Sequence, residues 1–477
     1  MSEVDRFINV YVQALRDENA AIFAGAGLSI PAGLVDWAAL MREIAEDVGL
    51  SVDREHDLVS LAQFHVNERG GRHRINQALI TEFAERASLT DNHKLLASLP
   101  IRTYWTTNYD TLLEGSLRQA RKRVDVKTTE ASLATTLPRR DALVYKMHGD
   151  VAQVDEAVVT RDDYEAYSTA HPLFSTALQG DLVSKTFLFI GFSFNDPNLS
   201  YILSRIRLLL GQNRRDHYCL LRRVQPDDFN TRAEYEYSRG KQDLQVRDLR
   251  RYGIQGLLLD SYSAYNNLLQ KVSNRFRRSR VFISGSAATY APLSDADGQE
   301  LLRTLGAHLI KDGFDIVTGF GFGLGPYLLN GALEGLEKEG TRSLHDRVTL
   351  RPFPQGISDP TVRAERWREY RRDMISTAGI ALFLFGNRLD QQGNIEIASG
   401  VQEEFELAAE AGLVLIPIGI TGYAAQELHT LVMQQYDTFY PTHPEWRDRL
   451  SELANSMDQF SLIDRIRALI NLIVKEA

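Results

Sequence analysis

Short runs of apolar residues recur along the first half of the chain, and each is followed at once by glycine or by polar residues. Residues 21–23 lead into Gly25-Ala26-Gly27, and later runs at 101–107, 142–147 and 186–190 also end in polar segments. Continuous apolar runs of this length are typical of strands buried on both faces of a parallel sheet. Ligands bind beyond the carboxyl ends of such strands, so we expect the polar segments to meet at one crevice.

Helical spacing of apolar residues separates these predicted strands. It predicts helices over residues 4–17 and around 37–48, and a helical insertion over 51–99 that we expect to cover the glycine loop. The first domain is completed by strands near 217–221 and 253–259 and by a helix from 262 to about 276.

The same alternation begins again after a basic segment at residues 275–280. The predicted strands of this second half are 281–285, 314–318, 347–351, 379–385 and 413–418. A second glycine loop, residues 319–325, precedes Pro326, which suits the first turn of a helix. The tail at 443–477 carries an apolar helical stripe that we expect to pack on its own domain rather than on another subunit. We therefore predict an α/β protein with two Rossmann-like, doubly wound domains in tandem, residues 1–277 and 278–477.

Composition supports two globular domains and excludes several classes of protein. The chain of 477 residues exceeds what one core usually supports, and 44% of its residues are hydrophobic. A formal net charge of −9 argues against broad capture of nucleic acid. Cys219 is the only cysteine, which excludes an intramolecular disulfide and a four-cysteine zinc site. The sequence shows no secretory signal and no apolar run near the ~18 residues of a membrane span, so we expect a cytoplasmic protein that does not bind membranes.

The Gly25-Ala26-Gly27 turn predicts a phosphate site, because glycine lets the backbone approach a ligand and a following helix would present free amides to an anion. The usual dinucleotide fingerprint needs a third glycine where this chain has Ile30. Its ribose-binding acid is also doubtful, since Glu43, Glu46 and Asp47 fall in a helical pattern. A hydride-transferring Rossmann enzyme is therefore disfavoured.

Asn108 and His148 directly follow two of the predicted strands. Cleavage of the bond between ribose and nicotinamide passes through an oxocarbenium-like state, which is helped by a base that titrates near neutral pH and by an amide that orients the nucleophile. His148 and Asn108 are residues of these two types. The structural alternative is that Asn108 caps a helix starting at Tyr109 and that His148 is a satisfied histidine at a strand end.

Four segments in this order resemble the NAD-binding domain of sirtuins: Gly25-Ala26-Gly27-Leu28-Ser29, Thr107-Asn108-Tyr109-Asp110, His148-Gly149 and Gly191-Phe192-Ser193. The resemblance implies NAD+ as the substrate and Asn108 and His148 as the catalytic residues, with His148 as the base. It also implies that the glycine loop holds the dinucleotide phosphates and that the segment from Gly191 contacts the adenosine side. The expected NAD-binding residues are Ala24, Gly25, Ala26, Gly27, Ser29, Asp110, Gly191, Ser193 and Asn195.

The chain departs from the sirtuin pattern in one informative respect. Protein-deacylating sirtuins usually carry a four-cysteine zinc module that supports the cleft for the acyl peptide, and this chain has one cysteine. Without that cleft we expect water as the acceptor, no metal, and hydrolysis of NAD+ to nicotinamide and ADP-ribose. The alternatives are a zinc-free NAD-dependent protein deacylase and an NAD-binding sensor without turnover.

The second half resembles the SLOG family of Rossmann-like nucleotide sensors, through Ser284-Gly285-Ser286, the loop at 318–325 and the helix start at 400–404. A sirtuin-like domain followed by a SLOG domain resembles the effectors of the Thoeris antiphage defence system. That resemblance implies that a TIR-domain partner makes a cyclic ADP-ribose isomer, that the SLOG domain binds it, and that the first domain then destroys cellular NAD+. It further implies a homo-oligomer, a tetramer or larger.

Two arginines and one glutamate are candidates for binding this signal. Arg371 and Arg388 are placed to hold its pyrophosphate, and Glu403 to accept hydrogen bonds from ribose hydroxyls. The alternative is that these residues lie on a solvated helix face and in a solvated loop. The expected signal-binding residues are Gly285, Ser286, Gly321, Phe322, Gly323, Arg371, Arg388, Gly400 and Glu403.

Overall fold

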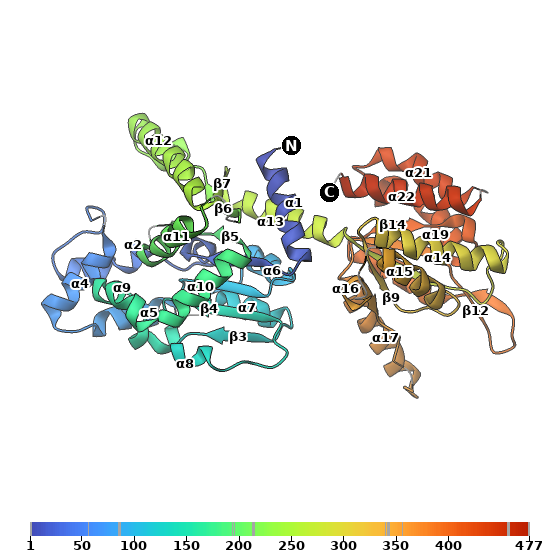
Figure 1. Cartoon of the computed structure of the whole chain (residues 1–477), viewed down its shortest axis with the longest axis horizontal. Helices are drawn as coiled ribbons and strands as arrows, with labels where there is room; N and C mark the ends of the chain where they lie inside the picture. The colour runs from blue at the N-terminus through green and yellow to red at the C-terminus, as the bar shows by residue number, and fades with distance from the viewer. Residues whose placement is uncertain are drawn as a thin grey trace. The chain divides into compact units, whose positions relative to one another are not determined.

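A computed structural model of the chain describes residues 2–475 except 56, 84–86, 193, 195, 212–214, 339, 341–343, 355 and 456–457. The chain forms two compact units, Met1–Ser273 and Asn274–Ala477, each built on its own parallel sheet (Figure 1). The predicted division after residue 277 falls at the end of helix α13 (Tyr262–Arg277), which crosses from one unit into the other. No helix among the described residues is long and apolar enough to cross a membrane.

The sheet of the first unit has seven parallel strands in the order β3-β4-β2-β1-β5-β6-β7. They are β1 (Ala20–Ala24), β2 (Thr103–Thr106), β3 (Val124–Lys127), β4 (Ala142–Lys146), β5 (Thr186–Ile190), β6 (His217–Arg222) and β7 (Ile254–Leu259). β1 is the central strand, with Ile22 opposite Tyr104 of β2 and Leu188 of β5. Strands β2, β3 and β4 lie on one side of β1, and strands β5, β6 and β7 lie on the other. The strand order therefore reverses between β1 and β5, where open parallel sheets bind their ligands.

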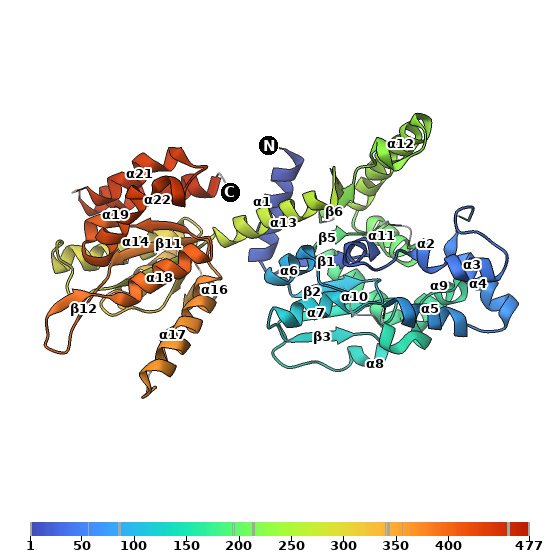
Figure 2. The ribbon, with the colours of Figure 1, turned by 180° about the vertical axis from the view of Figure 1, so that it is seen from behind.

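Helices lie on both sides of this sheet (Figures 1 and 2). They are α1 (Glu3–Arg16), α2 (Trp37–Leu40), α3 (Arg42–Asp47), α4 (Leu58–Arg69), α5 (His73–Phe83), α6 (Asp91–Ser98), α7 (Leu112–Gln119), α8 (Glu130–Leu133), α9 (Arg161–Ala170), α10 (Pro172–Ser184), α11 (Pro197–Leu210), α12 (Arg232–Leu249) and α13. The predicted helical insertion is confirmed as α4 to α6. Its helices α4 and α5 form an apolar cluster with α2 and α3 that includes Leu61, Leu79 and Tyr109, so they pack against the segment that follows β2.

The second unit repeats the plan with five parallel strands in the order β10-β9-β8-β11-β14. They are β8 (Arg280–Ser286), β9 (Asp315–Thr318), β10 (Val348–Leu350), β11 (Ile380–Phe385) and β14 (Val414–Pro417), and an antiparallel hairpin of β12 (Asn387–Leu389) and β13 (Ile395–Ile397) follows β11. The helices are α14 (Asp295–Lys311), α15 (Gly325–Lys338), α16 (Leu344–Arg347), α17 (Pro360–Ile375), α18 (Ser399–Glu410), α19 (Tyr423–Gln434), α20 (Tyr436–Phe439), α21 (Arg447–Ser451) and α22 (Gln459–Lys475). The apolar stripe of α22 is buried in the core of its own unit, as expected, although Phe460 at its start is exposed.

Candidate active site

Two glycine loops interlock at the point where the first sheet reverses its strand order. The amide of Gly25 donates to Ile190 O at 3.0 Å, and that of Gly27 donates to Gly191 O at 2.9 Å. A Cβ atom on Gly25 would lie 2.4 Å from Gly191 O, and Gly191 itself has a φ of +66°. The loops after β1 and β5 therefore need glycine to pack against each other, as well as to approach a ligand.

A cavity of about 850 Å³ opens beside these loops, within the range of small-molecule sites. Of the residues predicted for the NAD+ site, it is lined by Gly25, Ala26, Gly27, Ser29, Asn108, Asp110, His148 and Gly191. Ala24 is a fully buried residue of β1 and is not part of the lining. Ser193 and Asn195 lie outside the described residues.

The glycine loop continues into two short 3-10 turns, Ala26–Leu28 and Ile30–Ala32. The helix predicted around 37–48 is present as α2 and α3, but α2 begins only at Trp37, so the amides of its first turn do not follow the loop directly. Ile30 and Pro31 lie in the second turn, and the left-handed Gly33 ends it at a φ of +95°. Any anion at this loop would be held by the amides of the loop and its turns rather than by the end of an α-helix.

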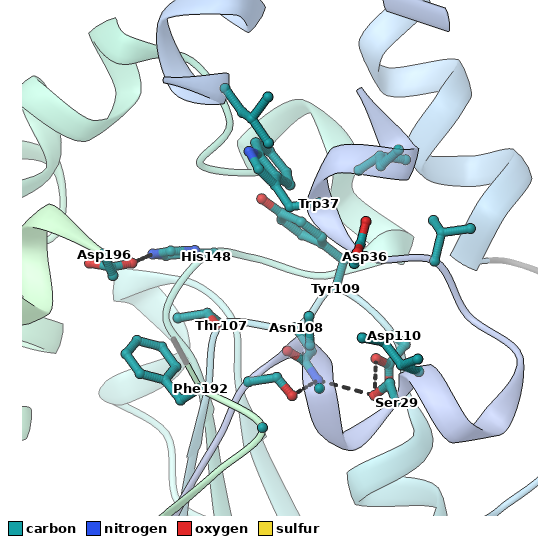
Figure 3. A pocket seen from close by; sticks show the side chains of 18 of the residues that line it. Ser29, Asp36, Trp37, Thr107, Asn108, Tyr109, Asp110, His148, Phe192 and Asp196 are labelled. Carbon is teal, nitrogen blue, oxygen red and sulfur yellow. Dashed lines mark hydrogen bonds and ion pairs between the residues drawn. The ribbon is translucent and has the colours of Figure 1, made fainter. Parts of the chain in front are cut away.

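Asn108 lines the cavity, and its amide nitrogen donates to Gly25 O and to Ser29 Oγ at 3.1 Å each (Figure 3). Ser29 Oγ in turn donates to Asp110 Oδ2 at 2.8 Å. The alternative role for Asn108, as the cap of a helix starting at Tyr109, is wrong because α7 begins at Leu112 and its first amide is bound by Asp110 Oδ1. Asn108 therefore belongs to a hydrogen-bonded chain that joins the ends of β1 and β2.

His148, which follows β4, faces a partner that the sequence did not reveal. Its Nε2 atom lies 2.9 Å from Asp196 Oδ2, and the two side chains are 5% and 6% exposed (Figure 3). Burial opposes ionisation of Asp196, but the charge of His148 and the hydrogen bonds around it hold the pKa of this carboxyl below its usual value. The segment Asp196-Pro197 is typical of a helix start, so the sequence predicts its capping role but not the contact with His148.

Lys146, the last residue of β4, is a fully buried cation that contacts the segments following β2 and β4. Its Nζ donates to Tyr109 O at 3.1 Å and to Asp110 O at 2.6 Å. The same nitrogen contacts the carboxylates of Glu114 and Asp150. Burial raises the pKa of Glu114, and the nearby charge of Lys146 opposes that rise. Lys146 therefore ties the segment containing Asn108 to the segment that follows His148.

Aromatic side chains close one wall of the cavity. Trp37 stacks on Tyr109 with ring centroids 6.3 Å apart (Figure 3). Phe83 of the insertion also lies against the Tyr109 ring. The hydroxyl of Tyr109 donates to Val158 O at 2.7 Å. The far end of the cavity is lined by residues of β6 and α13, namely Leu220, Leu221, Arg222, Tyr262 and Tyr265.

In the second unit, a comparable interlock joins the glycine loop after β9 to the end of β8. A Cβ atom on Gly321 would lie 1.9 Å from Gly285 O, and one on Gly323 would lie 2.0 Å from Ala287 O. The carbonyl of Phe322 accepts from the amide of Ala287, while its side chain is 75% exposed. The structure therefore brings together the predicted residues Gly285, Ser286, Gly321, Phe322 and Gly323.

The predicted charged residues of this unit all make ion pairs, but only Arg371 and Glu403 are paired with each other. Arg371 of α17 makes ion pairs with Glu403 and Glu404 of α18, and its guanidinium lies 4.8 Å from the ring centre of Phe353. Gly400 is adjacent, since a Cβ atom there would lie 2.9 Å from the Arg371 guanidinium. Arg388 is in the β12-β13 hairpin, where it pairs with Glu396 at 2.7 Å.

Metal ligands do not gather in the described part of the chain: none of its His, Cys, Asp and Glu side chains form a group of three or more that could hold an ion. Cys219 is buried in β6, and burial raises the pKa of its thiol far above the ordinary value.

Comparison with known proteins decides the family. Residues 102–240 match the SIR2-like domain family, and residues 265–474 match the Sir2- and TIR-associating SLOG family. The chain is 45% identical to the NAD(+) hydrolase ThsA of Bacillus cereus (strain MSX-D12), over 99% of this chain and 97% of the relative. The chain belongs to the ThsA family. It is also 43% identical to the NAD(+) hydrolase ThsA of Acinetobacter baumannii (strain 532279), over 98% of each chain.

The relation to the ThsA family covers both units, since the alignments extend over almost the whole chain. The protein named defense-associated sirtuin 2 of Bacillus subtilis is a more distant relative, 25% identical over 42% of this chain and 20% of its own length. The predicted order of a sirtuin-like domain followed by a SLOG domain is confirmed.

Proposed function

We propose that the chain hydrolyses NAD+ to nicotinamide and ADP-ribose in the cavity of its first unit. The observation that carries this proposal is that Asn108 and His148, which follow two different strands, line the same cavity as the interlocked glycine loops. Membership of a family of NAD(+) hydrolases supports the same reaction. The dinucleotide phosphates would lie at the amides of residues 25–29 and the nicotinamide ribose beside Asn108 and Asp110.

The residues divide the chemistry between them. Because the amide nitrogen of Asn108 binds Gly25 O and Ser29 Oγ, we assign its carbonyl oxygen to orienting the attacking water. The C–N bond to nicotinamide breaks with its electron pair on the ring nitrogen, which neutralises the pyridinium. Water oxygen bonds to the ribose carbon, and His148 removes a proton from the water or from a ribose hydroxyl and passes it to solvent.

We further propose that a cyclic ADP-ribose isomer, made by a TIR-domain partner, binds the second unit and activates hydrolysis during antiphage defence. Arg371 and Glu403 support this assignment because both belong to one cluster beside Phe353 and Gly400. Glu403 is the more exposed of the two glutamates that bind Arg371, with 27% of its side chain accessible against 10% for Glu404. A pyrophosphate that takes the place of Glu403 would keep the guanidinium paired.

The test follows nicotinamide and ADP-ribose released from NAD+ by the purified full-length protein. We expect equal amounts of both products, faster release with the activating cyclic ADP-ribose isomer, and no dependence on an acyl peptide. Release that requires an acyl-lysine peptide would instead indicate a deacylase. Binding of NAD+ without any product, with every isomer tested, would indicate a sensor.

A further inference from the structure

We infer that Asp196 is the positioning residue of His148, and this inference rests on the proposed role of His148 as the base. The ion pair is buried: the two side chains are 5% and 6% exposed and their nearest atoms are 2.9 Å apart. Asp196 also lines the cavity, so the pair forms part of its wall.

Both partners are held in place from several sides. Asp196 is the N-cap of α11, and its Oδ1 atom accepts from the amide of Leu199 at 2.8 Å. The His148 ring makes edge contacts with Tyr164 and Tyr167 of α9, with ring centroids 5.3 and 6.4 Å away. Because Oδ1 is fixed by the helix start, Oδ2 is the oxygen that remains to face His148.

The carboxylate determines which ring nitrogen of His148 can act as the base. A carboxylate oxygen 2.9 Å from Nε2 favours the neutral ring with its hydrogen on Nε2, which leaves the lone pair on Nδ1. In the proposed reaction the O–H bond of water or of a ribose hydroxyl breaks and an N–H bond forms at Nδ1. The positive ring is then stabilised by Asp196, which keeps its own negative charge throughout.

The two tyrosines that contact the His148 ring carry no negative charge at neutral pH, and the carboxylates of Glu130 and Asp163 act on those tyrosines rather than contacting the ring. Burial raises the pKa values of Tyr164 and Tyr167, and Tyr109 near Asp196 is raised in the same way. Burial lowers the pKa of His171, which caps the end of α9, so that ring is neutral at pH 7. Asp196 is therefore the anion in contact with His148 among the described residues.

Asp196→Asn is the sharpest test because it separates the charge from the helix cap. Asparagine is as good an N-cap as aspartate, so its oxygen would keep the bond to the Leu199 amide. Its NH2 group would then occupy the place of Oδ2 and donate to Nε2 of His148. That contact selects the tautomer with its hydrogen on Nδ1, which cannot accept a proton there.

We expect Asp196→Asn to lower kcat for NAD+ by on the order of 10-fold or more, within the ~100- to 10,000-fold that a general base supplies. The acid limb of the pH-rate profile should move to lower pH, because the ring loses its anionic neighbour. Asp359→Asn makes the same change at the N-cap of α17, in the second unit, and should leave rate and profile unaltered.

In a His148→Ala background, Asp196→Asn should cause no further loss of kcat. If Asp196 had a purely structural role, the double variant would lose more kcat than His148→Ala alone. A profile that keeps its position in Asp196→Asn, or an additive loss in the double variant, overturns the inference. Faster hydrolysis in Asp196→Asn also overturns the inference, because it would show that the contact with Asp196 inhibits His148.

NMR titration of the His148 imidazole in the full-length protein, with the signal assigned by its absence in His148→Ala, tests the pairing without turnover. The midpoint should fall in Asp196→Asn. If the wild-type protein does not hydrolyse NAD+ but this midpoint falls, the proposed function fails while the pairing stands. An unchanged midpoint contradicts the pairing whatever the activity.

Discussion

The two units place a glycine loop beside the central strand of a parallel sheet, but they surround that loop with different chemistry. In the first unit, Asn108 and His148 line an open cavity, and each is oriented by a neighbour that leaves part of the side chain for a ligand. In the second unit, Arg371 is bound to two glutamates on one helix, and Arg388 is bound within its own hairpin.

This difference agrees with the proposed division of function between the two units. A base and an amide held at a cavity are suited to a reaction that the site itself carries out. A cation bound to carboxylates of its own domain can exchange one carboxylate for the anion of a ligand, which changes the contacts between α17 and α18. In our proposal, one parallel sheet of seven strands carries the reacting site and one of five strands carries a site of ligand exchange, and the following variants test that contrast.

Lys146→Met should have the largest effect, because it leaves the carboxylates of Glu114 and Asp150 buried without their cation. Breaking a buried pair in this way costs about 3–5 kcal/mol of the free energy of unfolding. Urea denaturation measures the loss. Lys94→Met, which removes an exposed pair with Asp91, is the matched control and should cost less than about 1 kcal/mol. Equal losses in the two variants would show that the buried cation does not hold the strand ends together.

Asn108→Ala should lower kcat for NAD+ roughly 100- to 1000-fold, which corresponds to about 2.7–4 kcal/mol of transition-state stabilisation. The protein should stay folded, since the Asn108 side chain lines the cavity and is not part of the apolar core. Product release by chromatography and the melting temperature check both points. Asn67→Ala on the exposed face of α4 is the control. Activity within a few fold of wild type would remove Asn108 from the catalytic pair.

Acid should weaken the first unit through His217. This residue is buried in β6 and its Nδ1 accepts from the amide of Phe187, and burial lowers its pKa from 6.5 to about 4. The folded state therefore holds the neutral ring, while the unfolded chain takes up a proton below pH 6.5. Stability is complete above pH 6.5 and falls as the pH drops toward 4, by about 2 kcal/mol at pH 5.

His217→Gln should weaken this pH dependence, as measured by urea unfolding at pH 7, 6 and 5. His345→Gln changes an exposed histidine of the second unit and should leave the pH dependence as it is in the wild type. The same slope in wild type and His217→Gln would exclude His217 as its source.

Glu403→Gln is the smallest change and addresses the second unit. If Glu403 binds ribose hydroxyls or is exchanged for a pyrophosphate, the variant should alter the affinity for the cyclic ADP-ribose isomer about 10-fold, or about 1.4 kcal/mol, without changing hydrolysis in its absence. Calorimetry on the full-length protein measures binding. Glu410→Gln, an exposed glutamate of the same helix, is the control.

Arg371→Ala is a less specific test than Glu403→Gln. It would leave Glu404, which also accepts from Ser284 Oγ at 2.6 Å, buried without its cation. In Arg371→Ala, a loss of affinity for the signal could therefore not be separated from a loss of stability.

The fold was predictable where burial is continuous. β1 and β5 are buried along their whole length and appear in the sequence as apolar runs. β3 was missed because Val124–Lys127 alternates apolar with charged residues, and its Asp125 and Lys127 form a buried ion pair at 2.9 Å. The β12-β13 hairpin was missed because its strands have three residues each and are mostly exposed.

The candidate site was predictable only where a polar residue follows an apolar run. That pattern indicated Asn108 and His148, and the cavity contains both, although their catalytic roles stay predictions. Lys146 was missed because a lysine inside an apolar run gives no sign of burial. Asp196 was missed because its contact with His148 joins two strand ends, which only the order of strands in the sheet brings together.

The central claim is that one chain joins an NAD+-cleaving unit to a unit that binds a nucleotide signal. The most direct measurement is NAD+ consumption by the purified full-length protein, with and without cyclic ADP-ribose isomers, alongside Asn108→Ala. We expect that NAD+ is converted to equal amounts of nicotinamide and ADP-ribose, that one isomer raises the rate, and that Asn108→Ala stays roughly 100- to 1000-fold slower than the wild type with or without it. NAD+ that remains intact under every condition, or a rate that no isomer changes, would contradict it.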